Sequence, residues 1–199
     1  MTIQVSSDAP HCITMIGFIC SGKTEVCIKH PVLSKIERAD VDTFIFDAVK
    51  EQEFPSYKLA TQHPQDNVSF KRAFWDLLGY VKDDNDSVII DRLNIHRNSR
   101  QKLLSFFPNH NHIAINIHAQ LSICKQRYFS LERELETNGE HHLRRELSSK
   151  AFNQIGKSLH KVSLAEGYTS IIHLNQFGKL MFVEGEHSDF VRSVVEGLN

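Results

Sequence analysis

The chain has 199 residues, 41% of them hydrophobic and 24% charged, and this composition argues against a largely disordered protein. Its 23 lysines and arginines nearly balance its 24 aspartates and glutamates, so the formal net charge is −1 and bulk charge does not favour non-specific wrapping of duplex nucleic acid. The chain lacks the run of about 18 apolar residues that a membrane span needs, and its N-terminus does not have the pattern of a signal peptide. At roughly 100–200 residues per domain, the length predicts a single domain over residues 1–199.

The cysteines and histidines indicate the compartment. The four cysteines form no C-x-x-C pair, which is typical of reduced thiols in a cytoplasmic protein rather than of a disulfide framework or a zinc site. The twelve histidines are scattered, so a dedicated histidine metal site is not expected.

Apolar runs of strand length alternate with segments of helical periodicity along the chain. Strands are predicted over 13–17, 36–41, 88–91, 113–117, 170–174 and, at an edge, 179–183. Helices are predicted directly after Thr24, over 43–52, 69–80, 99–107 and 121–136, and from about residue 188. This alternation predicts an α/β fold in three layers, with a central, mainly parallel sheet covered by helices on both faces.

The segment Gly17 to Thr24, GFICSGKT, matches the phosphate-loop pattern G-x-x-x-x-G-K-[ST] between a predicted strand and a predicted helix. Gly17, Cys20, Ser21 and Gly22 are expected to bind ATP by curling backbone N–H groups around its phosphates. Lys23 would bridge the β- and γ-phosphates, and the Thr24 hydroxyl would ligate Mg²⁺. The segment therefore predicts a nucleoside-triphosphate site of P-loop type.

Two carboxylates follow the second predicted strand, in the sequence ADVDT. Ligands of open α/β sheets bind at the carboxyl ends of the strands, and a carboxylate there can accept the proton of an attacking hydroxyl. Asp42 is our candidate for this base, with Asp40 as the competing candidate. An alternative is that Asp42 caps a helix beginning at Thr43.

The third predicted strand ends at Asp91, a position suited to organising Mg²⁺ together with Thr24. Donors that could bind substrate phosphates follow it: Arg92, Asn94, Arg97 and Arg100. The alternative is the capped start of a helix with solvated arginines.

Residues 127–150 contain two charge-rich helical segments around a polar Thr-Asn-Gly stretch, which is typical of a lid over the phosphates. Within it, Arg127 could stabilise charge on the transferring phosphoryl group, and Arg133 could contact ATP. Either arginine could instead be an exposed helix residue paired with a neighbouring glutamate, namely Glu132, Glu134 or Glu136.

These blocks, in this order, resemble the polynucleotide 5′-hydroxyl kinases, a family that includes the phage kinase, the kinase domain of the animal DNA-end phosphatase/kinase and the kinase module of fungal tRNA ligases. The resemblance covers residues 13–174 and is carried by ITMIGFICSGKT, ADVDT, DRLNIHR, the lid arginines and SLAEGYTSI. It places the general base on Asp42 and the D-x-x-N block on Asp91 and Asn94, with Arg100 as the arginine that follows. The chain departs from the family in having Cys20-Ser21 in the loop and Ile45 where the phage enzyme has a substrate-binding arginine.

The resemblance implies an ATP- and Mg²⁺-dependent kinase that phosphorylates the 5′-hydroxyl of an RNA or DNA end. In that reading Lys23, Asp42 and Arg127 are catalytic. Two other functions stay open: a small-molecule P-loop kinase, which shares every motif except a channel for a polymer end, and an NTP-binding regulatory protein with little turnover.

Overall fold

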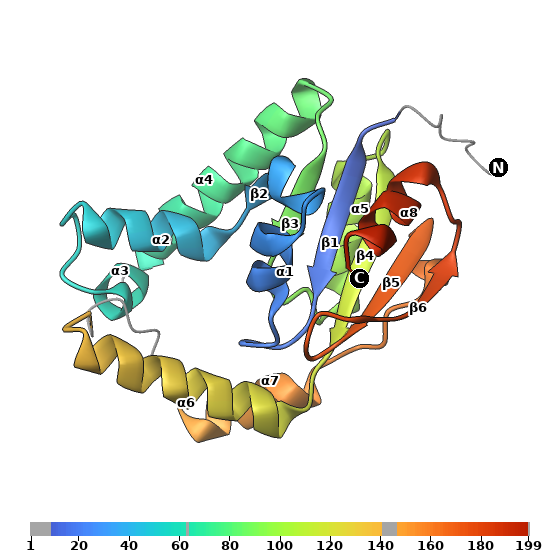
Figure 1. The fold of residues 1–199 in the computed structure, drawn as a ribbon. Coiled ribbons are helices and arrows are strands. Elements are labelled where there is room, and N and C mark those ends of the chain that lie inside the picture. Colours follow the sequence, from blue (N-terminus) through green and yellow to red (C-terminus); the bar gives the residue numbers. More distant parts are fainter. Residues whose placement is uncertain (1–8, 63, 141–146, 199) are drawn as a thin grey trace.

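The computed structural model describes residues 9–62, 64–140 and 147–198, and within them a six-stranded sheet forms the centre of the protein (Figure 1). The strands are β1 (His11–Ile16), β2 (Glu37–Ala39), β3 (Val88–Asp91), β4 (Asn111–His118), β5 (Ser170–Asn175) and β6 (Leu180–Gly185), in the spatial order β2-β3-β1-β4-β5-β6. All neighbouring strands are parallel except β6, which runs antiparallel to β5 at the edge. The mainly parallel α/β sheet predicted from the sequence is confirmed.

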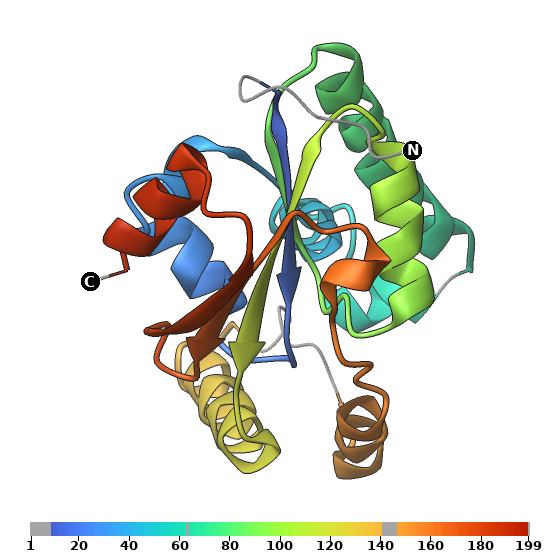
Figure 2. The ribbon, with the colours of Figure 1, turned by 90° about the vertical axis from the view of Figure 1, so that its right-hand side faces the viewer.

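Helices cover both faces of the sheet, as Figure 2 shows. They are α1 (Lys23–Lys29), α2 (Val41–Lys50), α3 (Tyr57–Gln62), α4 (Pro64–Asp83), α5 (Arg97–Phe106), α6 (Leu121–Thr137), α7 (Ser149–Lys157) and α8 (Asp189–Glu196). Side chains of β1 alternate between the two cores: Ile13 and Met15 pack with α1 and α8, whereas Cys12 packs with α4 and α5.

Two groups of helices extend beyond the sheet. Helices α2 and α3 pack on α4 through a separate apolar cluster that includes Ile45, Tyr57 and Phe70. Helices α6 and α7 pack against each other and against Phe18 and Ile19 of the phosphate loop, and in Figure 1 they lie below the carboxyl ends of the strands. The two groups therefore stand on either side of the edge where the predicted site residues gather.

The structure corrects several predicted elements. Helix α2 begins at Val41 rather than Thr43, because the Asp40 side chain accepts a hydrogen bond from the backbone N–H of Asp42 and so caps the helix. Helix α4 is longer than predicted, and the short helices α3 and α7 were not predicted. Of the predicted lid, residues 141–146 lie outside the described residues.

Two other expectations concern the cysteines and the membrane-spanning helices. Cys12, Cys20, Cys27 and Cys124 form no disulfide bond in the structure, in keeping with the expectation. None of the helices in the described ranges is both long and apolar enough to cross a membrane.

Candidate functional site

The phosphate loop connects the end of β1 to the start of α1, and its backbone is held in a tight curve. The N–H of Gly17 donates to the carbonyl of Leu93 at 3.2 Å. A Cβ on Gly17 would lie 2.7 Å from Ser21 Oγ, and Gly22 has a φ of 102°, so both positions favour glycine. Ser21 Oγ is buried and has no hydrogen-bond partner among the described residues. A buried donor without a partner inside such a loop fits a phosphate oxygen.

The Lys23 side chain lies against the backbone of this loop. It is buried, and Nζ donates to the carbonyls of Phe18 at 2.7 Å and Gly17 at 3.2 Å. Burial lowers the pKa of Lys23, while the nearby carboxylate of Asp91 acts in the opposite direction. The structure thus places a lysine, as predicted, where it can meet the phosphates of a nucleotide.

Thr24 and Asp91 form the second part of the site. Thr24 Oγ1 donates to Asp91 Oδ2 at 2.6 Å, and the same carboxylate oxygen accepts from the Arg38 guanidinium at 2.9 Å. A hydroxyl and a carboxylate are the oxygen donors that Mg²⁺ prefers, and the guanidinium shows that this carboxylate attracts a cation. The two residues predicted as metal ligands therefore fit that role.

Asp40 and Asp42 lie on β2–α2 and differ in what their carboxylates do. Both oxygens of Asp40 are engaged: Oδ1 caps α2, and Oδ2 accepts from Arg38 at 3.2 Å and from Thr43 at 3.3 Å. Burial and the neighbouring Asp42 raise the pKa of Asp40. Asp42 Oδ1 accepts a hydrogen bond from the Tyr57 hydroxyl at 2.7 Å. The capping role considered for Asp42 thus belongs to Asp40.

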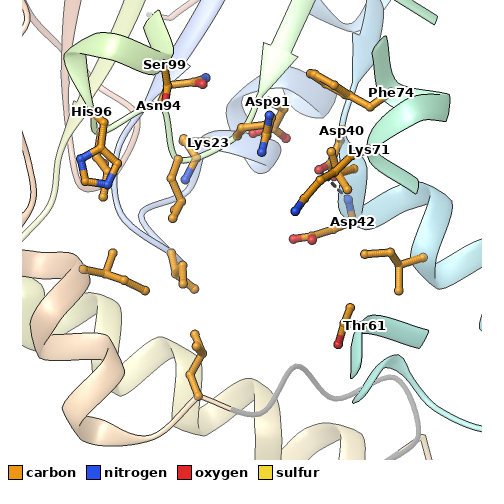
Figure 3. Close-up of a pocket in the computed structure, with 18 of the residues that line it drawn as sticks. Lys23, Asp40, Asp42, Thr61, Lys71, Phe74, Asp91, Asn94, His96 and Ser99 are labelled. Atoms are coloured by element: carbon orange, nitrogen blue, oxygen red, sulfur yellow. Dashed lines mark hydrogen bonds between the residues drawn. The ribbon is translucent and has the colours of Figure 1, made fainter. Parts of the chain in front are cut away.

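A cavity of about 1150 Å³ joins these groups (Figure 3). Its floor carries Lys23, Thr24 and Asp91 at the carboxyl edge of the sheet. One wall comes from α2, α3 and α4, and the other from α5 and α7. In Figure 3 Asp42 and Lys71 lie on one side of the cavity, with His96 and Ser99 on the opposite side. One cavity therefore has room for a nucleotide and a second molecule.

Arg100 was predicted to bind substrate, and the structure gives it a different role. The side chain is fully buried and pairs with Glu166 through Nη2 at 2.7 Å and Nε at 2.8 Å. It also donates to four backbone carbonyls, those of Asn94, Ile95, His160 and Lys161. With its donors committed inside the protein, Arg100 cannot reach a substrate, and the prediction is corrected.

Asn94 and Arg97 differ, because Asn94 lines the cavity and Arg97 does not. The Asn94 amide donates to the carbonyls of Met15 at 2.8 Å and Ile90 at 3.2 Å, so it braces the ends of β1 and β3. Arg97 is exposed at the first turn of α5 and is not among the residues that line the cavity. Of the four predicted substrate residues, Asn94 and Arg92 line the cavity, and Arg92 lies over the Phe74 ring at 4.9 Å.

The structure places the two predicted lid arginines, Arg127 and Arg133, in different surroundings. Arg127 donates to the loop carbonyls of Cys20 and Ser21, each at 3.4 Å, and to the carbonyl of Gln176 at 2.8 Å. It therefore lies against the phosphate loop. Arg133 is exposed and donates to the carbonyl of Phe129 on its own helix. Six positions along α6 turn Arg133 away from the face that Arg127 occupies, so the predicted ATP contact is corrected.

The sequence reasoning missed three residues of the site: Arg38, Tyr57 and Lys71. Arg38 had a usable signal, because an arginine inside a short strand leading to the ADVDT block needs an anionic partner. Tyr57 and Lys71 had none, since they reach the cavity only through the packing of α3 and α4 on α2.

Comparisons with known proteins agree with this geometry. The model of a family described as AAA domain matches residues 12–151. No curated protein matches the chain. A solved structure of a protein from Chloroflexus aurantiacus, described as "a putative kinase", has a TM-score of 0.59 at 12% identity, covering 84% of this chain and 89% of that one.

Two further solved structures are similar. A chain from the PezAT chromosomal toxin–antitoxin system of Streptococcus pneumoniae has a TM-score of 0.60 at 14% identity, covering 98% of this chain and 85% of that one. A gluconokinase from Sinorhizobium meliloti has a TM-score of 0.50 at 14% identity, covering 95% and 91% of the two chains. At these identities the likeness shows the fold, which is a P-loop NTPase-like α/β fold.

Proposed function

The chain belongs to the AAA domain family. We propose that it is an ATP-dependent phosphotransferase that moves the γ-phosphate onto a hydroxyl of a small molecule and releases ADP. The observation that carries this proposal is that three chemically different groups share one cavity: the Lys23 loop, the Thr24–Asp91 pair and the Asp42 carboxylate. Phosphoryl transfer needs these three parts, namely a phosphate cradle, a metal site and a proton acceptor.

The residues divide the work as follows. The loop N–H groups, Ser21 and Lys23 would bind the β- and γ-phosphates, and Thr24 with Asp91 would hold Mg²⁺. The bound Mg²⁺ would neutralise negative charge on the phosphates. Asp42 accepts the proton of the attacking hydroxyl, and the Tyr57 hydroxyl orients its carboxylate.

In this proposal Arg127 is a positioning residue, because its guanidinium holds the carbonyls of the phosphate loop and is not among the residues lining the cavity. Helices α6 and α7 act as the lid. Leu147, Ala151 and Ile155 line the cavity from this side, so the lid extends past the predicted limit at residue 150. We treat residues 1–199 as one kinase domain.

A small acceptor is better supported than the 5′ end of a nucleic acid. A polynucleotide strand was expected to be held by Arg92, Arg97 and Arg100 beside the sheet edge. Arg100 is buried against Glu166 and Arg97 lies outside the cavity lining, so of these three cations Arg92 alone lines the cavity. Among proteins of similar fold, the gluconokinase and a sugar kinase from Janibacter are named for small-molecule substrates.

The test is a transfer assay with labelled ATP and Mg²⁺ that offers two kinds of acceptor. One is a mixture of small polar metabolites, and the other is a 5′-hydroxyl oligonucleotide with its 5′-phosphorylated twin as control. We expect label in a small molecule and none in either oligonucleotide. Label in the 5′-hydroxyl oligonucleotide alone would establish the polynucleotide kinase instead. ATP binding without transfer to anything would indicate the regulatory NTP-binding protein.

A further inference from the structure

Resting on the proposed function, we propose that the acceptor of this kinase carries an anionic group, a phosphate or a carboxylate, bound by Lys71 and Arg92 beside Asp42. We call Lys71 and Arg92 together the acceptor-anion subsite. Nothing in the phosphate loop or the metal pair requires cations on this wall, so the subsite defines a property of the acceptor rather than of ATP.

The wall is one face of helix α4. Asn67, Lys71, Phe74 and Trp75 line the cavity. Asn67, Lys71 and Trp75 recur every four residues and Phe74 follows Lys71 by three, so the four lie on one side of the helix. Figure 3 shows Lys71 extending from this helix into the cavity, on the same side as Asp40 and Asp42. A polar and aromatic stripe thus faces the candidate base.

Two positively charged side chains, Lys71 and Arg92, lie at this face of α4. Lys71 is exposed to the cavity and has no ion pair or hydrogen bond within the described residues. The Arg92 guanidinium lies 4.9 Å above the Phe74 ring, three residues along α4 from Lys71. The ring holds the guanidinium through a cation–π contact, and Phe74 lies three residues after Lys71 on the same face of α4. Like charges brought together on an open wall favour an anion between them.

The charges of the cavity support the same conclusion. Among its described lining residues, four cations besides Lys23 face three carboxylates: Lys58, Lys71, Arg92 and Lys102 against Asp40, Asp42 and Asp91. Arg38, which does not line the cavity, already pairs with Asp40 and Asp91. The phosphates of ATP have Lys23 and the metal pair. The Lys71 side chain, which has no partner within the described residues, is therefore a cation on the Asp42 wall that a second anion can engage.

The experiment uses Trp75, the one tryptophan of the chain, as a reporter on the same helix face. The phosphate loop is first filled with a non-hydrolysable ATP analogue and Mg²⁺. Inorganic phosphate and, separately, acetate are then titrated at constant ionic strength while the fluorescence is recorded. We expect a saturable change with at least one of the two, and the stronger binder tells a phosphate-bearing acceptor from a carboxylate.

Variants of Lys71 and of its neighbour Arg72 show where the anion binds. Lys71→Met should weaken it by about tenfold or more, because a charge-assisted hydrogen bond is lost, and Lys71→Arg should restore most of it. Arg72→Met removes the neighbouring charge of the same helix, outside the cavity lining, and should leave binding unchanged. No saturable signal with either anion, or equal losses in Lys71→Met and Arg72→Met, would overturn the subsite.

The transfer assay separates this inference from the proposed function. Transfer to a neutral polyol as fast as to charged acceptors, and unaffected by Lys71→Met, would keep the kinase and refute the subsite. Saturable anion binding that depends on Lys71, without transfer to any small molecule, would refute the kinase and leave the anion site.

Discussion

Thr24 Oγ1 and Asp91 Oδ2 lie 2.6 Å apart, although 67 positions separate them in the chain. The loop that follows β1 and the end of β3 bring them together, because the two strands are parallel neighbours. Arg38 donates to the same Asp91 oxygen at 2.9 Å from β2, on the other side of β3. A guanidinium thus provides the positive charge for an aspartate whose side chain is only 2% exposed.

Arg38→Met should therefore destabilise the protein in a way that Mg²⁺ relieves. The variant leaves Asp91 buried without its guanidinium, at a cost of about 2 kcal/mol, less than for a fully buried pair because the Arg38 side chain is 25% exposed. Thermal unfolding in EDTA should show a loss of roughly 4–8 °C, and excess Mg²⁺ should restore most of it. A loss that Mg²⁺ does not change would contradict the assignment of Asp91 to the metal.

Lys23→Met should abolish most transfer and leave the fold intact. The variant removes the cation that faces the β- and γ-phosphates, and the loss of one such contact in a water-poor site lowers the rate by roughly a hundredfold. Lys29→Met, on the exposed face of the same helix, is the matched control and should transfer normally. The measurement is the initial rate of labelled phosphate transfer; a near-normal rate in Lys23→Met would refute the phosphate-loop site.

Arg100→Met should act on stability and not on acceptor binding. It leaves the Glu166 carboxylate, 2% exposed, without its partner, so the free energy of unfolding should fall by about 3 kcal/mol or more. Arg97→Met, in the exposed first turn of the same helix, should change it by less than about 0.5 kcal/mol. Denaturant unfolding measures both. If Arg100→Met kept its stability and raised only the KM of the acceptor, the substrate role would be restored.

Stability should fall as the solution is acidified from about pH 6.5 to pH 4, because of His112 at the start of β4. Burial lowers the pKa of His112 to about 4, with a smaller effect from His110. Between the two pKa values the unfolded chain binds the proton and the folded chain does not, so the stability contributed at neutral pH is lost on acidification, up to about 3 kcal/mol.

The pH dependence of unfolding separates this histidine from other titrating groups. His112→Gln should reduce the slope between pH 6.5 and 4 without removing it, because burial also lowers the pKa of His11, His110 and His173. His187→Gln, at an exposed position, should keep the slope of the wild type. Equal slopes in the wild type and in His112→Gln would show that His112 does not cause the loss.

Local patterns were sufficient to predict the sheet and the centre of the site. The fully buried VIID run of β3 gave both the strand and Asp91 at its end, and GFICSGKT gave the loop, because these signals lie within a few consecutive residues. The parallel order of the strands then brings Asp42, Asp91 and Lys23 to one edge.

The direction in which a side chain points depends on residues that are far away in the sequence. Sequence patterns therefore did not predict these directions. Arg100 follows Asp91 in the same way as a phosphate ligand would, but Glu166, 66 positions later, draws it into the core. Helix α7 has one buried side chain, Phe152, which packs on Tyr128 of α6. Its apolar residues Ala151, Phe152 and Ile155 recur at helical spacing, so this helix had a sequence signal that was missed. Lys71 reaches the cavity only because α4 packs on α2 and α3.

The most direct test of the proposed function is phosphoryl transfer by Asp42→Asn, with ATP binding measured on the same preparation. The asparagine keeps the size of the side chain but cannot accept the hydroxyl proton, so transfer should slow by about a hundredfold or more while ATP affinity is unchanged. Asp47→Asn, at an exposed position of α2, is the matched control and should behave as the wild type. Transfer at the wild-type rate in Asp42→Asn would contradict the account of this site.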